Sequence, residues 1–181
     1  MDVFLYQTPE GFDNMLMSTD GEVLSGLWFE GSRDADKHLS NLVETCRGAS
    51  LPPIIHDTCQ WLDIYFSGHQ PDFTPNYRMH DLTPFRKEVL DIVCEIPFGH
   101  TLTYGEIANR IVETFPETSL NKSEKPRKMS AQAVGGAVGW NPICLIVPCH
   151  RVMGANGKLT GYGGGLHNKI ALLKLEGLCL I

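Results

Sequence analysis

The residues with the clearest chemical potential are Cys149 and His150, which follow one another in the stretch Pro148–Val152. A thiol is nucleophilic only as the thiolate, and at a pKa of about 8.5 little of it is ionised at pH 7. A neighbouring histidine, polarised by a carboxylate and linked directly or through one water, is the usual means of ionising it. Glu176 is the best-placed acid because the region around it is otherwise basic. These residues predict a nucleophilic cysteine site.

An inert cysteine is the competing interpretation, because buried free cysteines are common and a Cys-His pair alone is weak evidence. No metal site is expected, since adjacent residues do not easily bind one ion and the other histidines lack ligand spacing. The remaining cysteines stand on apolar faces or runs or near the chain end and are interpreted as inert free thiols: Cys46, Cys59, Cys94, Cys144 and Cys179.

The elements that must position this site fall into two regions. In residues 1–80, alternating apolar residues at Val3–Gln7 and Glu22–Phe29 flank the turn Asp20-Gly21 and predict strands of an antiparallel sheet. Helical spacing predicts helices over Leu39–Cys46 and, after two prolines, over Ile55–Phe66. The first region is therefore expected to be a small α+β domain.

The polar, proline-containing passage Gly68–Asp81 is the predicted linker to a mostly helical second domain, residues 81–181. Cap residues predict helices after Thr83-Pro84, from Thr103–Glu106 to about Val112, over Ala131–Val138 after Ser130, and from Leu166 to Gly177. The run Leu145–Val147, before the reactive cysteine, is typical of a buried strand or strand-like segment.

The stretch Gln132–Gly139, most of which lies in the helix predicted over Ala131–Val138, is unusually rich in glycine. Gly135, Gly136 and Gly139 follow in quick succession, and each costs about 0.5–1 kcal/mol in a helix relative to alanine. Something is expected to approach this backbone closely. Tight packing against another helix and a smooth face that enters a nucleic-acid groove both satisfy the pattern.

Charge is unevenly distributed along the 181 residues, whose net charge is −6. Residues 1–80 hold 12 acids and 4 bases, whereas residues 81–181 hold 9 acids and 11 bases. From Lys122 to Lys174 there are 8 bases and one acid. Because salt screens charges beyond about 10 Å, this local excess matters more than the net charge, and it favours binding of a polyanion. A solvated basic surface without a partner is the alternative. No apolar run of membrane-spanning length and no secretory signal pattern stand out, so a cytoplasmic location is expected.

Motifs along the second region resemble the 6-O-alkylguanine-DNA alkyltransferases, also called methylated-DNA-protein-cysteine methyltransferases. They are Pro148–Val152, Ala133–Ala137, Asn141-Pro142, Gly161–Gly165, Leu175–Gly177, Thr83–Phe85 and Tyr104–Ala108. The match is close from about Thr83 to Gly177, and the first 80 residues match only in general layout. The resemblance implies a ribonuclease H-like N-terminal domain and a C-terminal DNA-binding, alkyl-acceptor domain with a winged-helix-like helix-turn-helix.

The resemblance implies direct DNA repair by a protein that is spent in the reaction. A monomer, associated with the nucleoid when bound, holds duplex DNA through the minor groove and flips out a 6-O-alkylated guanine. Cys149 then takes the alkyl group, His150 acts through a water as its base, and Glu176 orients that histidine. No cofactor is implied.

Further roles follow from the same resemblance. Asn141 is the hinge asparagine between the recognition helix and the active-site segment, and Tyr104 donates its hydroxyl to the leaving guanine and crowds the neighbouring phosphate. The backbone carbonyls of Cys149 and Val152 read the exocyclic amine. Tyr162 and Gly163 line the substrate pocket, and Gln132, Ala133, Gly135 and Gly136 join Tyr104 in contacting DNA.

Two features depart from the family pattern. Gln132 stands where family members often have an arginine that fills the gap left by the extruded base, so weaker or more salt-tolerant binding is expected. The stretch Glu113–Lys128 is longer than in compact members and carries four bases, which predicts an enlarged loop with added phosphate contacts.

Three other classes compete with this interpretation. An alkyltransferase-like protein that binds lesions without chemistry lacks the reactive cysteine, whereas Cys149 is present. A cysteine hydrolase using Cys149, His150 and Glu176 would turn over repeatedly. A helix-turn-helix regulator needs base-reading side chains, in which the glycine-rich helix is poor.

Overall fold

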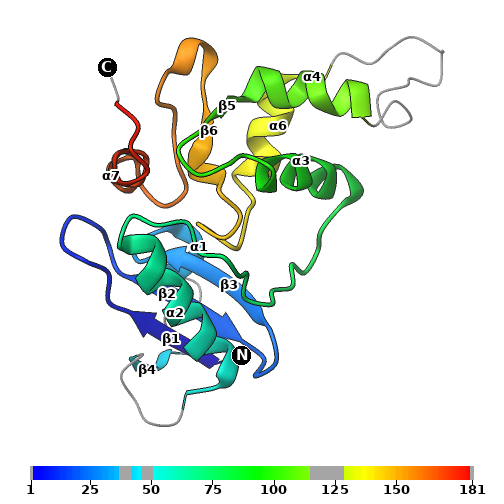
Figure 1. Ribbon diagram of the computed structural model, residues 1–181. Coiled ribbons are helices and arrows are strands. Elements are labelled where there is room, and N and C mark those ends of the chain that lie inside the picture. Colours follow the sequence, from blue (N-terminus) through cyan, green and yellow to red (C-terminus); the bar gives the residue numbers. More distant parts are fainter. Residues whose placement is uncertain (1, 37–41, 46–50, 115–128, 180–181) are drawn as a thin grey trace.

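The first region is built on a small mixed sheet. In this computed structural model, which describes residues 2–36, 42–45, 51–114 and 129–179, four strands lie in the order β3-β2-β1-β4 (Figure 1). They are β1 (Asp2–Tyr6), β2 (Met15–Thr19), β3 (Leu24–Phe29) and β4 (Leu42–Thr45). β2 runs antiparallel to both neighbours, whereas β4 pairs in parallel with β1.

This sheet corrects two predictions. The turn at Asp20-Gly21 follows β2, not the strand at Val3–Gln7. β2 is three apolar residues followed by two polar ones, so it lacks the apolar–polar alternation by which β1 and β3 were predicted. The helix predicted over Leu39–Cys46 is wrong at Leu42–Thr45, where pairing with the free edge of β1 outweighs a helical spacing of only a few residues. The ends of that range lie outside the described residues.

A helix packs against each face of the sheet. The predicted helix after the two prolines is confirmed as α2 (Pro53–Phe66), and Figure 1 shows it lying across one face. Its Ile55, Leu62 and Tyr65 are fully buried in the main core, which continues into the second region. On the other face, the short α1 (Arg33–Asp36) covers a smaller apolar cluster through Ala35.

Three helices form the centre of the second region: α3 (Pro84–Cys94), α4 (Tyr104–Thr114) and α6 (Ala131–Val138). Each begins at its predicted cap. The Thr83 and Ser130 hydroxyls accept from backbone amides in the first turns of α3 and α6. Thr103 and Glu106 bond each other's backbone amides in a reciprocal capping box before α4.

The remaining elements of this region surround the reactive cysteine. β5 (Leu102–Thr103) pairs in parallel with β6 (Val152–Met153), which follows the short 3-10 helix η2 (Cys149–Arg151). A second 3-10 turn, η3 (Ala155–Gly157), leads towards α7 (Leu166–Leu175). After α7 the chain leaves the helix at Gly177, the predicted C-terminal glycine, whose φ of 84° suits glycine.

The two regions are joined by backbone pairing as well as by the core. The amide of Leu27 in β3 donates to the Pro142 carbonyl at 2.8 Å, and the Cys144 amide donates to the Leu27 carbonyl at 2.9 Å. β3 thus extends the sheet onto the segment that precedes Cys149. The predicted α+β class is confirmed, while the ribonuclease H-like and winged-helix-like details and the boundary at residue 80 stay predictions.

Two further predictions meet the limits of the described residues. Across the part of the chain that the structure describes, every helix is too short or too polar to cross a membrane. The enlarged loop predicted over Glu113–Lys128 falls, after Thr114, outside the described residues.

Candidate functional site

Asn141 fastens the segment that carries Cys149. Its side-chain oxygen accepts from the Ile143 amide at 3.0 Å, while its amide nitrogen donates to the Val147 carbonyl at 2.9 Å. The same nitrogen lies 3.1 Å from the Cys149 sulfur. One buried side chain therefore holds both ends of the segment and touches the thiol.

The segment itself is a turn, which corrects the strand-like prediction for Leu145–Val147. Leu145 has a φ of 68°, a left-handed conformation that costs a branched residue roughly 1–2 kcal/mol. Cys144 pairs with Val147 across this turn in an isolated bridge. The bonds from Leu27 and Asn141 hold the turn closed, so tertiary contacts override the apolar pattern.

His150 and Glu176 form a buried pair behind the thiol. The histidine Nε2 lies 2.8 Å from the Glu176 carboxylate, and both side chains are fully buried. The Arg151 guanidinium donates three further bonds to the same carboxylate, at 2.9, 2.9 and 3.1 Å, and the Gly99 amide donates another at 3.1 Å. The carboxylate is therefore a hub at which several donors converge.

Tyr65, from α2 in the first region, completes this hub. Its hydroxyl donates to Glu176 at 2.7 Å and lies 3.1 Å from His150 Nε2. The tyrosine is fully buried and its ring stacks on Trp61, with centroids 5.3 Å apart. The N-terminal region thus supplies a side chain to the candidate site.

The protonation states of this pair follow from its environment. Burial raises the pKa of Glu176, but hydrogen bonds from His150 and Arg151 outweigh it and bring the pKa to about 2. Burial lowers the pKa of His150, so the ring is neutral at pH 7. Because an ionised carboxylate only accepts, Nε2 carries the ring proton and Nδ1 keeps a free lone pair. Nδ1 is buried and has no hydrogen-bond partner among the described residues.

The Cys149 thiol is acidified by its neighbours. Hydrogen bonding with the Cys144 thiol and from the Asn141 amide lowers its pKa to about 7, although burial opposes the shift. The ammonium of Lys169, itself fully buried and bonded to the Val152 carbonyl, also favours the thiolate. A thiol with this pKa is largely ionised slightly above neutral pH.

The thiol opens into a cavity of about 80 Å³ that gathers predicted residues from several elements. Its lining includes Cys149, Asn141, Tyr104, Gly135, Tyr162 and Gly163. The Tyr104 ring lies 3.7 Å from the position that a side chain on Gly135 would occupy, so α4 and α6 meet at the mouth of the cavity. Val152 lies outside this lining and its carbonyl accepts from Lys169.

The outer face of α6 is exposed to solvent at one of its glycines. Gln132, Ala133 and Gly136 are exposed, and a side chain on Gly136 would meet nothing within 4 Å. Val134, Ala137 and Val138 face the core instead. Helix packing therefore does not require Gly136, which leaves a smooth outer face next to the cavity.

Four residues near the thiol were not predicted to serve the site: Tyr65, Cys144, Arg151 and Lys169. Tyr65 lies in a helix predicted only as part of the core, and Cys144 was interpreted as inert. Arg151 and Lys169 belong to the basic stretch, yet both are buried and engaged with Glu176 and Val152. The basic character expected of this surface is therefore overstated. For Cys144 and Arg151 the sequence signal was proximity to the reactive motif, whereas Tyr65 and Lys169 lie far from it in the sequence.

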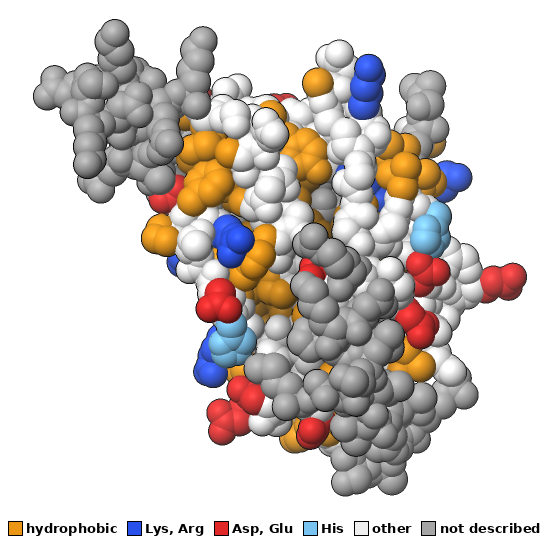
Figure 2. Space-filling view, turned by 180° about the vertical axis from the view of Figure 1, so that it is seen from behind, with side chains coloured by type: hydrophobic (Ala, Val, Ile, Leu, Met, Phe, Trp, Pro, Cys, Tyr) orange, Lys and Arg blue, Asp and Glu red, His pale blue; other side chains and the backbone are white. Residues whose placement is uncertain are grey.

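The acidic first region shows on the molecular surface. On the face drawn in Figure 2, acidic side chains outnumber basic ones, and basic and acidic side chains lie side by side at the lower left (Figure 2). Two of the described bases from the basic stretch, Lys158 and Lys174, are exposed.

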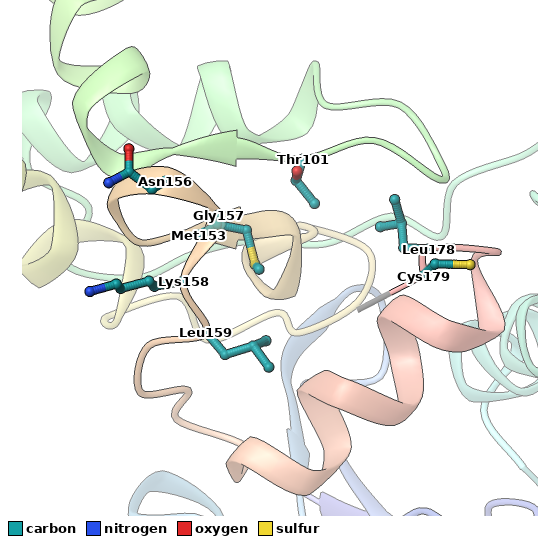
Figure 3. A pocket seen from close by; sticks show the side chains of 8 residues that line it. All are labelled: Thr101, Met153, Asn156, Gly157, Lys158, Leu159, Leu178 and Cys179. Carbon is teal, nitrogen blue, oxygen red and sulfur yellow. The ribbon is translucent and has the colours of Figure 1, made fainter. Parts of the chain in front are cut away.

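A larger hollow of about 570 Å³ lies apart from the thiol (Figure 3). Its lining comes from Thr101 before β5, from β6, from η3 and the two residues after it, and from Leu178 and Cys179 after α7. Among the described residues of its lining, Lys158 is the one charged residue, and none is a histidine or a carboxylate. The described lining therefore lacks the histidine–carboxylate pair that stands behind Cys149.

Sequence comparisons agree with the motifs. The family described as 6-O-methylguanine DNA methyltransferase, DNA binding domain, matches residues 84–178. A methylated-DNA–protein-cysteine methyltransferase of Methanosarcina mazei is 49% identical over 153 residues, which is 81% of this chain and 87% of that protein. A relative of the same name from Mycobacterium bovis is 44% identical over 115 residues, covering 64% of this chain and 61% of that protein.

Solved structures show the same relationship. OGT of Mycobacterium tuberculosis, determined in complex with DNA, superimposes with a TM-score of 0.75 at 32% identity, over 97% of this chain and 92% of that chain. An O6-methylguanine DNA methyltransferase of Methanococcus jannaschii gives a TM-score of 0.60 at 29% identity, over 98% and 95% of the two chains. This chain belongs to the 6-O-methylguanine DNA methyltransferase family.

Proposed function

We propose that this protein repairs 6-O-alkylguanine in duplex DNA by transferring the methyl or alkyl group to its own Cys149, once per molecule. The arrangement around the sulfur carries the proposal. Cys149 lines a cavity and has a pKa of about 7, and the neighbouring His150 keeps its Nδ1 lone pair free. The chain itself supplies nucleophile and base, so no cofactor is part of the proposal.

In the proposed reaction the Cys149 proton passes through a water to His150 Nδ1, and the thiolate attacks the alkyl carbon. A carbon–sulfur bond forms while the bond from that carbon to the guanine oxygen breaks, and the electron pair stays on the guanine. Tyr104, at the mouth of the cavity, donates its hydroxyl to that oxygen. The product thioether is not exchanged by thiols, so each molecule reacts once.

Positioning falls to the residues around the pair. Glu176 holds the His150 tautomer in which Nδ1 is the acceptor, and Tyr65 restricts both groups through its hydroxyl. Asn141 fixes the sulfur and the turn together. Tyr162 and Gly163 line the pocket. The carbonyls of Cys149 and Val152 read the exocyclic amine, and Val152 does so through the lone pair that Lys169 leaves open.

DNA is proposed to bind through the minor groove against the outer face of α6, with Ala133, Gly135 and Gly136 allowing close approach. Extruding the base costs a few kcal/mol, less for a mispaired lesion. Gln132 fills the vacated space and bonds the orphaned partner base. If Gln132→Arg leaves both DNA affinity and repair rate unchanged, this role for Gln132 is wrong.

The proposed organisation follows the sequence motifs. Residues 1–80 form the N-terminal domain and residues 81–181 the DNA-binding and alkyl-acceptor domain of a monomer. The protein acts in the cytoplasm and is associated with the nucleoid when bound to DNA.

A stoichiometry measurement tests the proposal. Duplex DNA carrying 6-O-methylguanine with a labelled methyl group is mixed in excess with the protein, and label on protein is counted over time. We expect label to rise to one equivalent and stop. Continued release of label into solution would instead support a cysteine hydrolase, and DNA binding without any labelling would support a lesion-binding module.

A further inference from the structure

The acceptor thiol has a second thiol beside it. Cys144 and Cys149 both line the cavity under Tyr104, and both are buried, at 7% and 6% exposure. The turn through Leu145 folds Cys144 back against Val147, two residues before Cys149. Each thiol influences the pKa of the other, as expected of two thiols that share one small cavity.

This pair has the properties of a reversible redox couple. Susceptibility to oxidation rises with thiolate character, and the thiol nearest to an oxidised cysteine decides whether the oxidation can be reversed. Cys149 has a lowered pKa of about 7, whereas hydrogen bonding to Cys149 and burial raise the pKa of Cys144. Cys149 is therefore the thiol that reacts first, and Cys144 stays protonated beside it. The glycines Gly161 and Gly163 are exposed at the edge of the cavity and leave room for a small oxidant.

We propose that Cys144 is a resolving cysteine, which closes a disulfide with Cys149 after hydrogen peroxide has oxidised the acceptor thiol. In the first step the Cys149 thiolate attacks one peroxide oxygen, the oxygen–oxygen bond breaks, and hydroxide leaves. Cys149 becomes a sulfenic acid and the peroxide is reduced. In the second step the Cys144 sulfur attacks the Cys149 sulfur, the sulfur–oxygen bond breaks, and the oxygen leaves as water with the Cys144 proton.

The charge change favours the second step. The negative charge on Cys149 contributes to the raised pKa of Cys144, and this charge disappears when Cys149 becomes a sulfenic acid. Cys144 then ionises more readily next to its target. The overall change consumes two thiols and one peroxide and yields one disulfide and two waters.

The disulfide protects the acceptor from loss. Without a resolving thiol, a sulfenic acid continues to sulfinic acid, which ordinary thiols do not reduce. With Cys144 in place, a thiol reductant restores Cys149. The consequence for repair, a reversible block of alkyl transfer, rests on the proposed function, whereas the disulfide itself does not.

Peptide mass spectrometry tests the proposal on the full-length protein. Protein at pH 7 is exposed to a few equivalents of hydrogen peroxide, free thiols are blocked with iodoacetamide, and trypsin is added without reductant. Cleavage after Lys128 and Arg151 gives a peptide, residues 129–151, whose cysteines are Cys144 and Cys149. We expect this peptide to be two hydrogens lighter and unlabelled, and to take two labels after treatment with dithiothreitol.

Variants separate the resolving role from general oxidation. In Cys144→Ser we expect no disulfide and two added oxygens on Cys149, while Cys179→Ser, which alters an exposed thiol, should still form the disulfide. A wild-type peptide with two labelled thiols or with added oxygens at Cys149 would overturn the proposal, as would a disulfide found only between molecules.

Alkyl transfer is assayed in parallel on reduced, oxidised and re-reduced wild-type protein. We expect transfer to be lost on oxidation and recovered on reduction. Disulfide formation in a protein that never accepts alkyl groups would contradict the proposed function and leave the redox proposal standing. If protein that has been shown to contain the disulfide still transfers alkyl groups at the full rate, the proposed block of repair is wrong.

Discussion

The sheet region and the helical region contribute different things to the site. The helical region supplies the reacting groups: the Cys149 sulfur, the His150 base and the Glu176 carboxylate. The sheet region supplies backbone bonds from Leu27 and a single hydroxyl from Tyr65. Chemistry is therefore concentrated in one region, and the geometry that makes it possible is shared by both.

The contrast in charge leads to the same conclusion. The first 80 residues are strongly acidic, and a surface of that kind opposes phosphate contacts. Yet α2 and β3 from this region reach the buried side of the site, away from the outer face of α6. Two of the bases in the second region are likewise turned inward, to Glu176 and Val152. Net charge by region thus says less about the site than the burial of individual groups.

The largest expected effect comes from the carboxylate hub of the helical region. Glu176→Gln leaves Arg151 buried without its ionic partner, and such changes cost about 3–5 kcal/mol of unfolding free energy. Because folding depresses the pKa of Glu176 from 4.5 to about 2, its contribution to stability is complete above pH 4.5 and is lost as the pH falls towards 2.

Urea unfolding of this variant and the wild type at several pH values measures both effects. Glu22→Gln, which removes an exposed acid from the sheet region, is the matched control and should change little. If both variants lose the same free energy of unfolding, the hydrogen bonds at Glu176 do not stabilise the protein more than an exposed acid does.

A smaller effect tests whether the sheet region contributes to the chemistry. Tyr65→Phe removes one buried hydroxyl and leaves its partners short of a bond, which costs about 1–3 kcal/mol. A loss of orientation worth about 1.4 kcal/mol would slow alkyl transfer on the order of tenfold. The measurement is the single-turnover rate of methyl transfer across pH.

Tyr6→Phe is the control for this variant, because its hydroxyl bonds Asp63 at 2.6 Å within the same region but away from the site. We expect it to lower stability without changing the transfer rate or its pH profile. If both variants slow transfer to the same degree, Tyr65 acts only through stability.

The pH dependence of Cys149 alkylation shows which region sets the pKa of the thiol. With a pKa of about 7, the rate at which Cys149 reacts with iodoacetamide should rise about tenfold from pH 6 to pH 8 and then level off. Asn141→Ala should move this midpoint upward, because it removes a donor to the sulfur, whereas Tyr65→Phe should leave it in place. A rate that rises about tenfold from pH 6 to pH 7 alone and is still rising above pH 8 would show an unperturbed thiol with a pKa of about 8.5.

The smallest effect concerns the glycine-rich helix. Ser130→Ala removes the N-cap of α6 and should cost about 1 kcal/mol. Since α6 carries the proposed DNA face, affinity for duplex DNA should fall slightly while iodoacetamide labelling of Cys149 stays unchanged. A changed rate of Cys149 labelling with unchanged affinity for DNA would contradict this account, because it would show that α6 positions the thiol and does not bind DNA.

Local signals predicted most of the second region. The caps at Thr83, Thr103 and Ser130 and the glycine at Gly177 depend on short-range bonds, so the sequence alone locates α3, α4, α6 and the end of α7. The motif around Cys149 is a local signal too, and together with Glu176 it was enough to predict the family and the central pair.

The remainder depends on contacts between distant residues. β4 and the turn at Leu145 follow from pairing with β1 and Leu27, which no local pattern reports. Tyr65 lies 85 residues from His150 and 111 from Glu176, and only folding shows their contact. Cys144 resembles any other buried thiol in the sequence, and only the turn places it beside Cys149.

The central claim is that Cys149 is the alkyl acceptor, and its most direct test is mass spectrometry after mixing the reduced protein with duplex DNA that contains 6-O-methylguanine. We predict that the tryptic peptide of residues 129–151 gains one methylene on Cys149, up to one equivalent, while Cys144 stays unmodified. An unmodified peptide from correctly folded protein, or a methyl group on another residue, would contradict the claim.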